Sequence, residues 1–146
     1  MSFPWAKHYE PKAPLMKWLG VPLDLIEPMG FQWDDKRVAR AAMDYIDHVE
    51  VVRHANWAAF HTARPGAHLT LFSSKATRSP YGHVFGAEDI LLFGKESAGV
   101  PDHVARACRT RLRIPMQPAV RSLNLATSAA LALGEALRQT GQLPPF

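Results

Sequence analysis

Cysteine is nearly absent from the sequence, since Cys108 is the single one among 146 residues. One cysteine cannot form an internal disulfide, and it cannot supply a cysteine cluster for zinc. The sequence also lacks an apolar run of the roughly 20 residues that a membrane-spanning helix needs. Its first residues have neither the basic nor the apolar region of a signal peptide. Together these absences predict a cytoplasmic protein.

Metal-ligand spacing is missing as well. The seven histidines form neither an HxxxH nor an HExxH pattern, and these are the spacings that bring two imidazoles to one face of a helix. Scattered histidines without such spacing are weak evidence for a bound metal. We therefore expect a protein that works without a metal ion.

The stretch LLFGKESAGVP at 91–101 lacks the residues of a phosphate-binding loop. Gly94 and Gly99 have the spacing of the two glycines in such a loop, but Val100 and Pro101 stand where Lys and Ser or Thr are needed. A proline also removes a backbone donor that would contact the anion. Taken alone, the stretch favours an ordinary connection from a strand to a helix.

Charge of either sign is modest, with 17 basic and 13 acidic residues and a formal net charge of +4. Arginine outnumbers lysine, and its guanidinium favours bidentate contacts with phosphate and carboxylate groups. Two local basic groups comprise Lys36, Arg37 and Arg40, and then Arg106, Arg109, Arg111 and Arg113. A solvated face and a nucleic-acid surface both remain open as interpretations.

The order of the expected elements indicates an α/β fold with a mostly parallel sheet flanked by helices. Strands are expected at 23–26, 48–54, 68–73, 89–94 and 111–115, and helices at 34–45, 55–64, 101–109 and 121–141. The length predicts one domain over residues 1–146. Residues 1–18 contain three prolines and no sustained periodicity, which predicts an irregular amino-terminal arm.

The last expected helix is apolar over much of its circumference. One stripe comprises Leu123, Ala126, Ala130, Leu133 and Leu137, and a second, made mostly of small residues, comprises Leu125, Ala129, Ala132 and Ala136. A helix with so wide an apolar surface is normally covered on more than one side. We expect the second cover to be another subunit, with burial inside the monomer as the alternative.

Three segments together resemble the SPOUT class of RNA methyltransferases. They are LDLIEPMGFQWDDKRVARAAMDY at 23–45, ILLFGKESAGVP at 90–101 and RIPMQPAVRSLNLATSAALALGEALRQ at 113–139. The similarity is greatest to the subgroup that 2′-O-methylates the ribose of the wobble nucleotide, cytidine 34, in tRNA. The resemblance runs from about Leu19 to Gly141, and its strings IEPMGF and RSLNL are specific.

The resemblance implies a fold in which the carboxyl-terminal chain passes through a loop to make a deep trefoil knot, an exception to ordinary chain threading. It also implies a homodimer whose interface includes the last helix. The implied cofactor is S-adenosylmethionine, held by three backbone segments. By family position its pocket comprises Phe72, Gly94, Ile114, Ser122 and Leu123. Met116 would add apolar packing or belong to the core, and Glu96 would hold the loop after the LFG string.

The third motif implies the residues nearest the reaction. Ser122 would contact the cofactor or the ribose while capping the last helix, Asn124 would orient the nucleotide, and Arg121 would hold a phosphate. The implied partner is the tRNA anticodon stem-loop, contacted by the group of Lys36, Arg37 and Arg40.

The amino-terminal segment departs from the family pattern. Family members begin with a strand and then a helix that carries an Asn-x-Gly-x-x-x-Arg motif. Here HYEPKAPLMKWLGVPLDL stands at 8–25, and the Asn, the Gly and the Arg of that motif do not occur at its spacing. Such a loss would leave a gap in the sheet where the first strand lies. It leaves two functions open, an active tRNA ribose methyltransferase and a degenerate SPOUT protein that binds cofactor or RNA without turnover.

Overall fold

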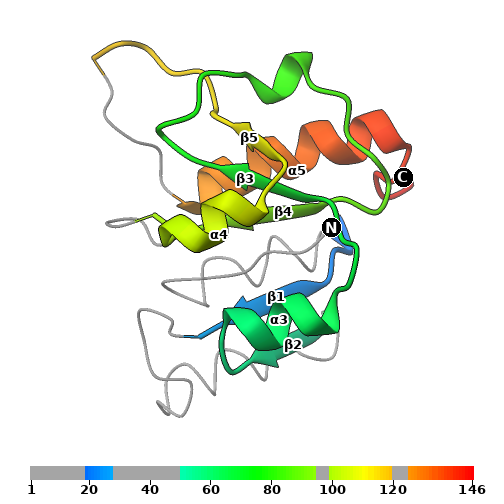
Figure 1. Cartoon of the computed structure of the whole chain (residues 1–146). Coiled ribbons are helices and arrows are strands. Elements are labelled where there is room, and N and C mark those ends of the chain that lie inside the picture. Colours follow the sequence, from blue (N-terminus) through cyan, green and yellow to red (C-terminus); the bar gives the residue numbers. More distant parts are fainter. Residues whose placement is uncertain (1–18, 28–49, 95–98, 120–124) are drawn as a thin grey trace, which may run out of the picture.

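The computed structural model describes residues 19–27, 50–94, 99–119 and 125–146, and these form parallel sheets flanked by helices (Figure 1). Strands β1 (Leu23–Ile26) and β2 (Val51–His54) make one parallel sheet. A second parallel sheet has the order β4 (Ile90–Phe93), β3 (Leu69–Phe72) and β5 (Thr110–Leu112). The prediction of an α/β fold with parallel strands is therefore confirmed.

Three helices and a short 3-10 turn complete the described part. They are α3 (Trp57–Ala63), the 3-10 turn η1 (Pro80–Gly82), α4 (Asp102–Ala107) and α5 (Leu125–Thr140). None of the helices in the described ranges is long and apolar enough to cross a membrane.

Local sequence explains where α3 and α5 begin or end. The side chain of Asn56 accepts a hydrogen bond from the main-chain N–H of Ala59 at 2.8 Å, which caps the first turn of α3. Helix α5 ends at Gly141, which has a φ of +69°. The N–H of Gln142 then donates to the carbonyl of Leu137 at 2.9 Å, as in a Schellman cap.

Strand β5 lies earlier than expected, at Thr110–Leu112 instead of 111–115. The main-chain N–H of Arg113 donates to the carbonyl of Arg78 at 2.8 Å, so the chain leaves the β3 ladder at this residue. Pro115 has no N–H with which to rejoin it. The expected strands at 23–26, 48–54, 68–73 and 89–94 and the helices at 55–64 and 101–109 are confirmed within a few residues at each end. The helix expected at 34–45 and the arm at 1–18 lie outside the described residues.

Both sheets contribute side chains to the same two buried clusters, one on each face. On one face, Leu25 of β1 and Phe93 of β4 pack in the same buried cluster as α5. On the other face, Ile26 and Leu92 pack in a second cluster with Phe60 of α3 and Val104 of α4. This alternation follows the two-residue period of strands. In Figure 1 the strands of both sheets run in the same direction, so their carboxyl ends lie on one side of the molecule.

The apolar surface of α5 is divided differently from the expectation. Ala129, Ala132 and Ala136 are fully buried in the same core as Leu133, while Ala130 is exposed. The three alanines of the small-residue stripe are therefore covered within a single chain, and the prediction that they are open to a second subunit is wrong. The physical reason is that alanine side chains are small enough to let α5 lie close to the sheet. The alanines therefore lie where the helix and the sheet are closest.

Candidate cofactor and RNA site

The carboxyl ends of β3, β4 and β5 bring three of the predicted cofactor residues together. Phe72 ends β3 and is in register with Phe93 on one side and with Leu112 on the other. Gly94 directly follows Phe93, and Ile114 follows Leu112 by two residues. Ligands of open parallel sheets bind outside the carboxyl ends of the strands. The structure thus places Phe72, Gly94 and Ile114 at the edge where a ligand is expected.

Two aromatic rings stack on each other at this edge of the sheet. The rings of Phe72 and Phe93 have centroids 5.0 Å apart and planes within 9° of parallel. Phe72 is 9% exposed and Ile114 is 7% exposed, so both are nearly covered by the chain itself. Phe93 was not among the predicted site residues. Its signal in the sequence is that it occupies the same strand position in ILLF as Phe72 does in LTLF.

Position 94 must be glycine, because neighbouring backbone atoms leave no room for a Cβ atom. A Cβ atom at this position would lie 2.5 Å from the carbonyl carbon of Gly99 and 2.7 Å from its oxygen. Gly99 itself has a φ of +65°, in the left-handed region that favours glycine. The chain after β4 therefore returns against Gly94 so closely that a side chain cannot fit. The two glycines that first suggested a phosphate loop are therefore in close contact.

The segment after β3 is fixed to the exit of β5. The N–H of Ser73 donates to the carbonyl of Leu112 at 2.9 Å, which extends the β3–β5 ladder by one bond. The side chain of Arg113 donates to the carbonyl of Ser74 at 3.3 Å. Ala76 is 8% exposed and anchors the segment in the molecule. These hydrogen bonds and the burial of Ala76 thus hold residues 73–78 beside Phe72.

Several predicted site residues lie outside the described residues. They are Lys36, Arg37, Arg40, Glu96, Arg121, Ser122, Leu123 and Asn124. Met116 is described and is partly buried, which agrees with either of its two expected roles. The roles assigned to the residues outside the described ranges remain predictions.

A buried polar network was missed by the sequence reasoning. Oδ1 of Asp24 lies 2.7 Å from Nε2 of His54 and accepts a hydrogen bond from Nη2 of Arg64 at 2.9 Å. Asp24 and His54 are 2% and 6% exposed, and the ring of His54 makes an edge contact with Phe60. The network joins β1 and β2 to the end of α3. Its members are 30 and 40 residues apart in the chain, so no short motif could reveal it.

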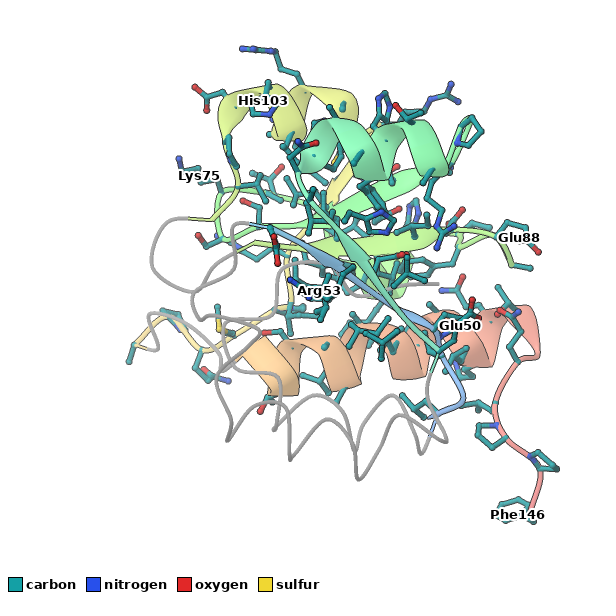
Figure 2. All side chains as sticks on the ribbon, turned by 90° about the horizontal axis from the view of Figure 1, so that it is seen from below. Glu50, Arg53, Lys75, Glu88, His103 and Phe146 are labelled. Carbon is teal, nitrogen blue, oxygen red and sulfur yellow. The ribbon has the colours of Figure 1, made fainter. Side chains whose placement is uncertain are left out.

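The glutamate of the IEPMGF string has a described partner. Glu27 follows β1 and accepts a hydrogen bond from Arg53 of β2, and both side chains are about one third to one half exposed. Arg53 is labelled in Figure 2. The pair joins the two strands of the first sheet, so a supporting role for Glu27 is the simplest account of this part of the string.

Cys108 is not a nucleophile at neutral pH. Burial raises the pKa of its thiol to about 11, and its Sγ donates to the carbonyl of Val104 at 3.3 Å. A thiol in such surroundings stays protonated, and the thiolate is the reactive form. The described part of the chain also contains no group of three side chains able to hold a metal ion.

Comparison with known proteins agrees with this arrangement. The model of the SpoU rRNA Methylase family matches residues 15–134. The chain therefore belongs to the SpoU methylase family.

Relatives within the family are more specific. The tRNA (cytidine(34)-2′-O)-methyltransferase of Beijerinckia indica subsp. indica is 46% identical over 127 residues, covering 86% of this chain and 79% of the relative. The protein of the same name from Escherichia coli (strain K12) is 37% identical over 143 residues, covering 91% of both. A solved structure described as "Structural insights into the 2-OH methylation of C/U34 on tRNA" has a TM-score of 0.84 at 39% identity, covering 94% of this chain and 93% of that one.

A more distant solved structure shares the fold. The SpoU methyltransferase AviRb from Streptomyces viridochromogenes, in complex with the cofactor AdoMet, has a TM-score of 0.77 at 22% identity. It covers 94% of this chain and 58% of its own. At this identity the likeness concerns the fold alone.

Proposed function

We propose that this protein methylates the ribose 2′-hydroxyl of the wobble nucleotide in the tRNA anticodon loop, using S-adenosylmethionine. The observation that carries the proposal is the convergence of Phe72, Gly94 and Ile114 at one carboxyl edge. Its support from relatives is that the Escherichia coli enzyme, named for cytidine 34 methylation, aligns over 91% of both chains.

The described residues fit a nucleotide cofactor that is partly apolar. Phe72 and Ile114 have apolar side chains, and Phe72 stacks on the buried ring of Phe93. Glycine at position 94 leaves main-chain groups uncovered by a side chain, and such groups can hydrogen-bond an adenine edge. When bound, the cofactor supplies the activated methyl group.

The remaining roles fall to residues that precede α5 in the sequence. Ser122 and Leu123 complete the cofactor pocket, Asn124 orients the ribose, and Arg121 holds a phosphate. The reaction needs close, in-line positioning of the hydroxyl and removal of its proton. The RNA is contacted by Lys36, Arg37 and Arg40. No metal takes part.

The proposal includes the finer features of the fold. Residues 1–146 form a single SPOUT domain with a deep trefoil knot near its carboxyl end, and the protein is a cytoplasmic homodimer that assembles through α5. Because the small-residue stripe is covered, the face available to a partner is the opposite one, where Ala130 and Leu131 are exposed. Leu131 is 40% exposed.

A second candidate function is binding of cofactor or RNA without turnover. It is favoured by the sequence of residues 8–25, which lacks the Asn, Gly and Arg of the family's first motif. Lys12 or Lys17 offers positive charge there, but an ammonium does not replace the guanidinium fork.

One assay separates the two functions. Anticodon stem-loops are incubated with the protein and methyl-labelled cofactor, and the product is mapped to the wobble ribose. Label at that 2′-oxygen supports the enzyme. Binding of both ligands without label supports the second candidate, and binding of neither contradicts both.

A further inference from the structure

Uncompensated positive charge surrounds β5. The segments 69–85 and 99–119 contain six Lys and Arg residues and one acidic residue, Asp102. The six are Lys75, Arg78, Arg106, Arg109, Arg111 and Arg113, and all of them are exposed. Among the described residues, no carboxylate forms an ion pair with any of the six. This region therefore carries a positive charge larger than the +4 of the whole chain.

Four of these residues lie on segments that backbone hydrogen bonds join to one another, and we call them the β5 basic surface (Lys75, Arg78, Arg111, Arg113). Arg111 of β5 and Arg113, which directly follows the strand, are both exposed, whereas Leu112 between them is buried. The N–H of Arg113 donates to the carbonyl of Arg78 at 2.8 Å. Lys75 is held in the same turn, because its N–H donates to Oγ of Ser73 at 3.2 Å.

Neutral groups orient the side chains of Arg111 and Arg113. Nη2 of Arg111 donates to the carbonyl of Ala105 at 2.9 Å, and Nη1 of Arg113 donates to the carbonyl of Ser74 at 3.3 Å. A carbonyl fixes a guanidinium without cancelling its charge, and four of its five N–H donors stay available. Side chains ordered beforehand lose less entropy when they bind a ligand.

The β5 basic surface adjoins the proposed cofactor edge. Arg113 lies between Leu112, which is in register with Phe72, and Ile114. Figure 2 shows Lys75 and His103 toward one end of the molecule, whereas Glu50 and Glu88 lie toward the other. Glu50 precedes β2 and Glu88 precedes β4, whereas Lys75 follows β3 and Arg113 follows β5. The basic side chains beside β3 and β5 favour an anionic ligand at this part of the carboxyl edge.

We propose that the β5 basic surface binds the phosphate backbone of the RNA substrate beside the site of methyl transfer. This inference rests on the proposed function and adds a second contact region to the one expected at Lys36, Arg37 and Arg40. Arginine matches a phosphate with two parallel hydrogen bonds. Contacts to phosphate position an RNA and carry no sequence information.

The test compares binding of the anticodon stem-loop across several salt concentrations. The variants are the double change Lys75→Ala with Arg78→Ala, and Arg113→Gln, which keeps a donor for the carbonyl of Ser74. The matched control is Arg138→Gln, because Arg138 is an exposed arginine already paired with Glu135. Cofactor binding, measured by calorimetry, reports whether each variant keeps its fold and pocket.

We expect the two test variants to bind the stem-loop several-fold more weakly while cofactor affinity is unchanged. The plot of log affinity against log salt should become shallower by about 0.7 to 1 for each phosphate that the variant no longer binds. A stem-loop of scrambled loop sequence should lose affinity by the same factor. The Arg138→Gln control should match the parent.

The results separate this inference from the proposed function. In one outcome, the parent binds and methylates the stem-loop while the test variants keep the parent's affinity and salt slope. In that case RNA binding by the β5 basic surface is overturned, and the proposed function stands. If the parent binds no stem-loop, both are overturned. If the variants lose affinity by a factor that depends on loop sequence, these side chains read bases, and backbone recognition is wrong.

Discussion

Oδ1 of Asp24 accepts a hydrogen bond from Arg64 and also lies 2.7 Å from the imidazole of His54, so one buried oxygen joins β1, β2 and the end of α3. Removing Asp24 leaves the buried imidazole of His54 without this partner, and an unsatisfied buried polar group costs about 1 to 3 kcal/mol. We expect Asp24→Ala to lower the free energy of unfolding by about that amount, as measured by urea denaturation.

The exposed pair of Glu27 and Arg53 provides the control for this measurement. Both side chains are partly in water, and such pairs contribute about 0 to 1 kcal/mol. Glu27→Ala should therefore be much less destabilising than Asp24→Ala. Equal losses for the two variants would contradict a special role for the buried network.

Gly94→Ala tests the close contact between Gly94 and Gly99. Its Cβ would lie 2.5 Å from the backbone of Gly99, so the backbone at Gly99 must move, at a cost of about 1 to 3 kcal/mol as for other overpacked sites. We expect lower stability and loss of S-adenosylmethionine affinity in calorimetry, and the larger Gly94→Val should abolish binding. Gly82→Ala is the control, because nothing lies within 4 Å of its added Cβ. Unchanged affinity in Gly94→Ala would place the cofactor elsewhere.

Ala129→Glu distinguishes a core position from an interface position. Ala129 is fully buried within the chain, and an unpaired charge there has no solvent or partner. We expect loss of the folded state, seen by circular dichroism, and not a folded monomer. Ala130→Glu, on the exposed side of α5, should keep the fold and shift the mass measured by light scattering from dimer to monomer. A folded Ala129→Glu protein would show that this residue is not in the core.

Alkaline pH should destabilise the protein through Cys108. Burial raises the pKa of its thiol from 9.0 to about 11, so the folded state holds the proton more tightly than the unfolded state does. The resulting stability is complete below about pH 9 and is lost as the pH rises through 11. Denaturation of the parent and of Cys108→Ala between pH 8 and 11 should show a steeper loss in the parent. Parallel curves would contradict the assignment to this thiol.

Much of the fold was readable from local pattern, because short apolar runs such as LTLF and ILLF form strands buried on both faces and helix ends carry Asn56 and Gly141. The resemblance supplied Phe72, Gly94 and Ile114, which composition and spacing alone would not. The sequence did not reveal the partners of Asp24, because tertiary contact over 30 and 40 residues has no local signature. It also misassigned the alanines of α5, since small residues favour both a close core contact and a close subunit contact.

The shared faces of the two sheets bear on how the molecule unfolds. Leu25 and Phe93 belong to different sheets but to one buried cluster, and Ile26 and Leu92 do the same on the opposite face. Separating the sheets would expose both apolar clusters to solvent at once. We therefore expect the two sheets to unfold together. Amide hydrogens of β1 and of β4 should consequently exchange with solvent through the same opening event, with equal protection and equal sensitivity to denaturant.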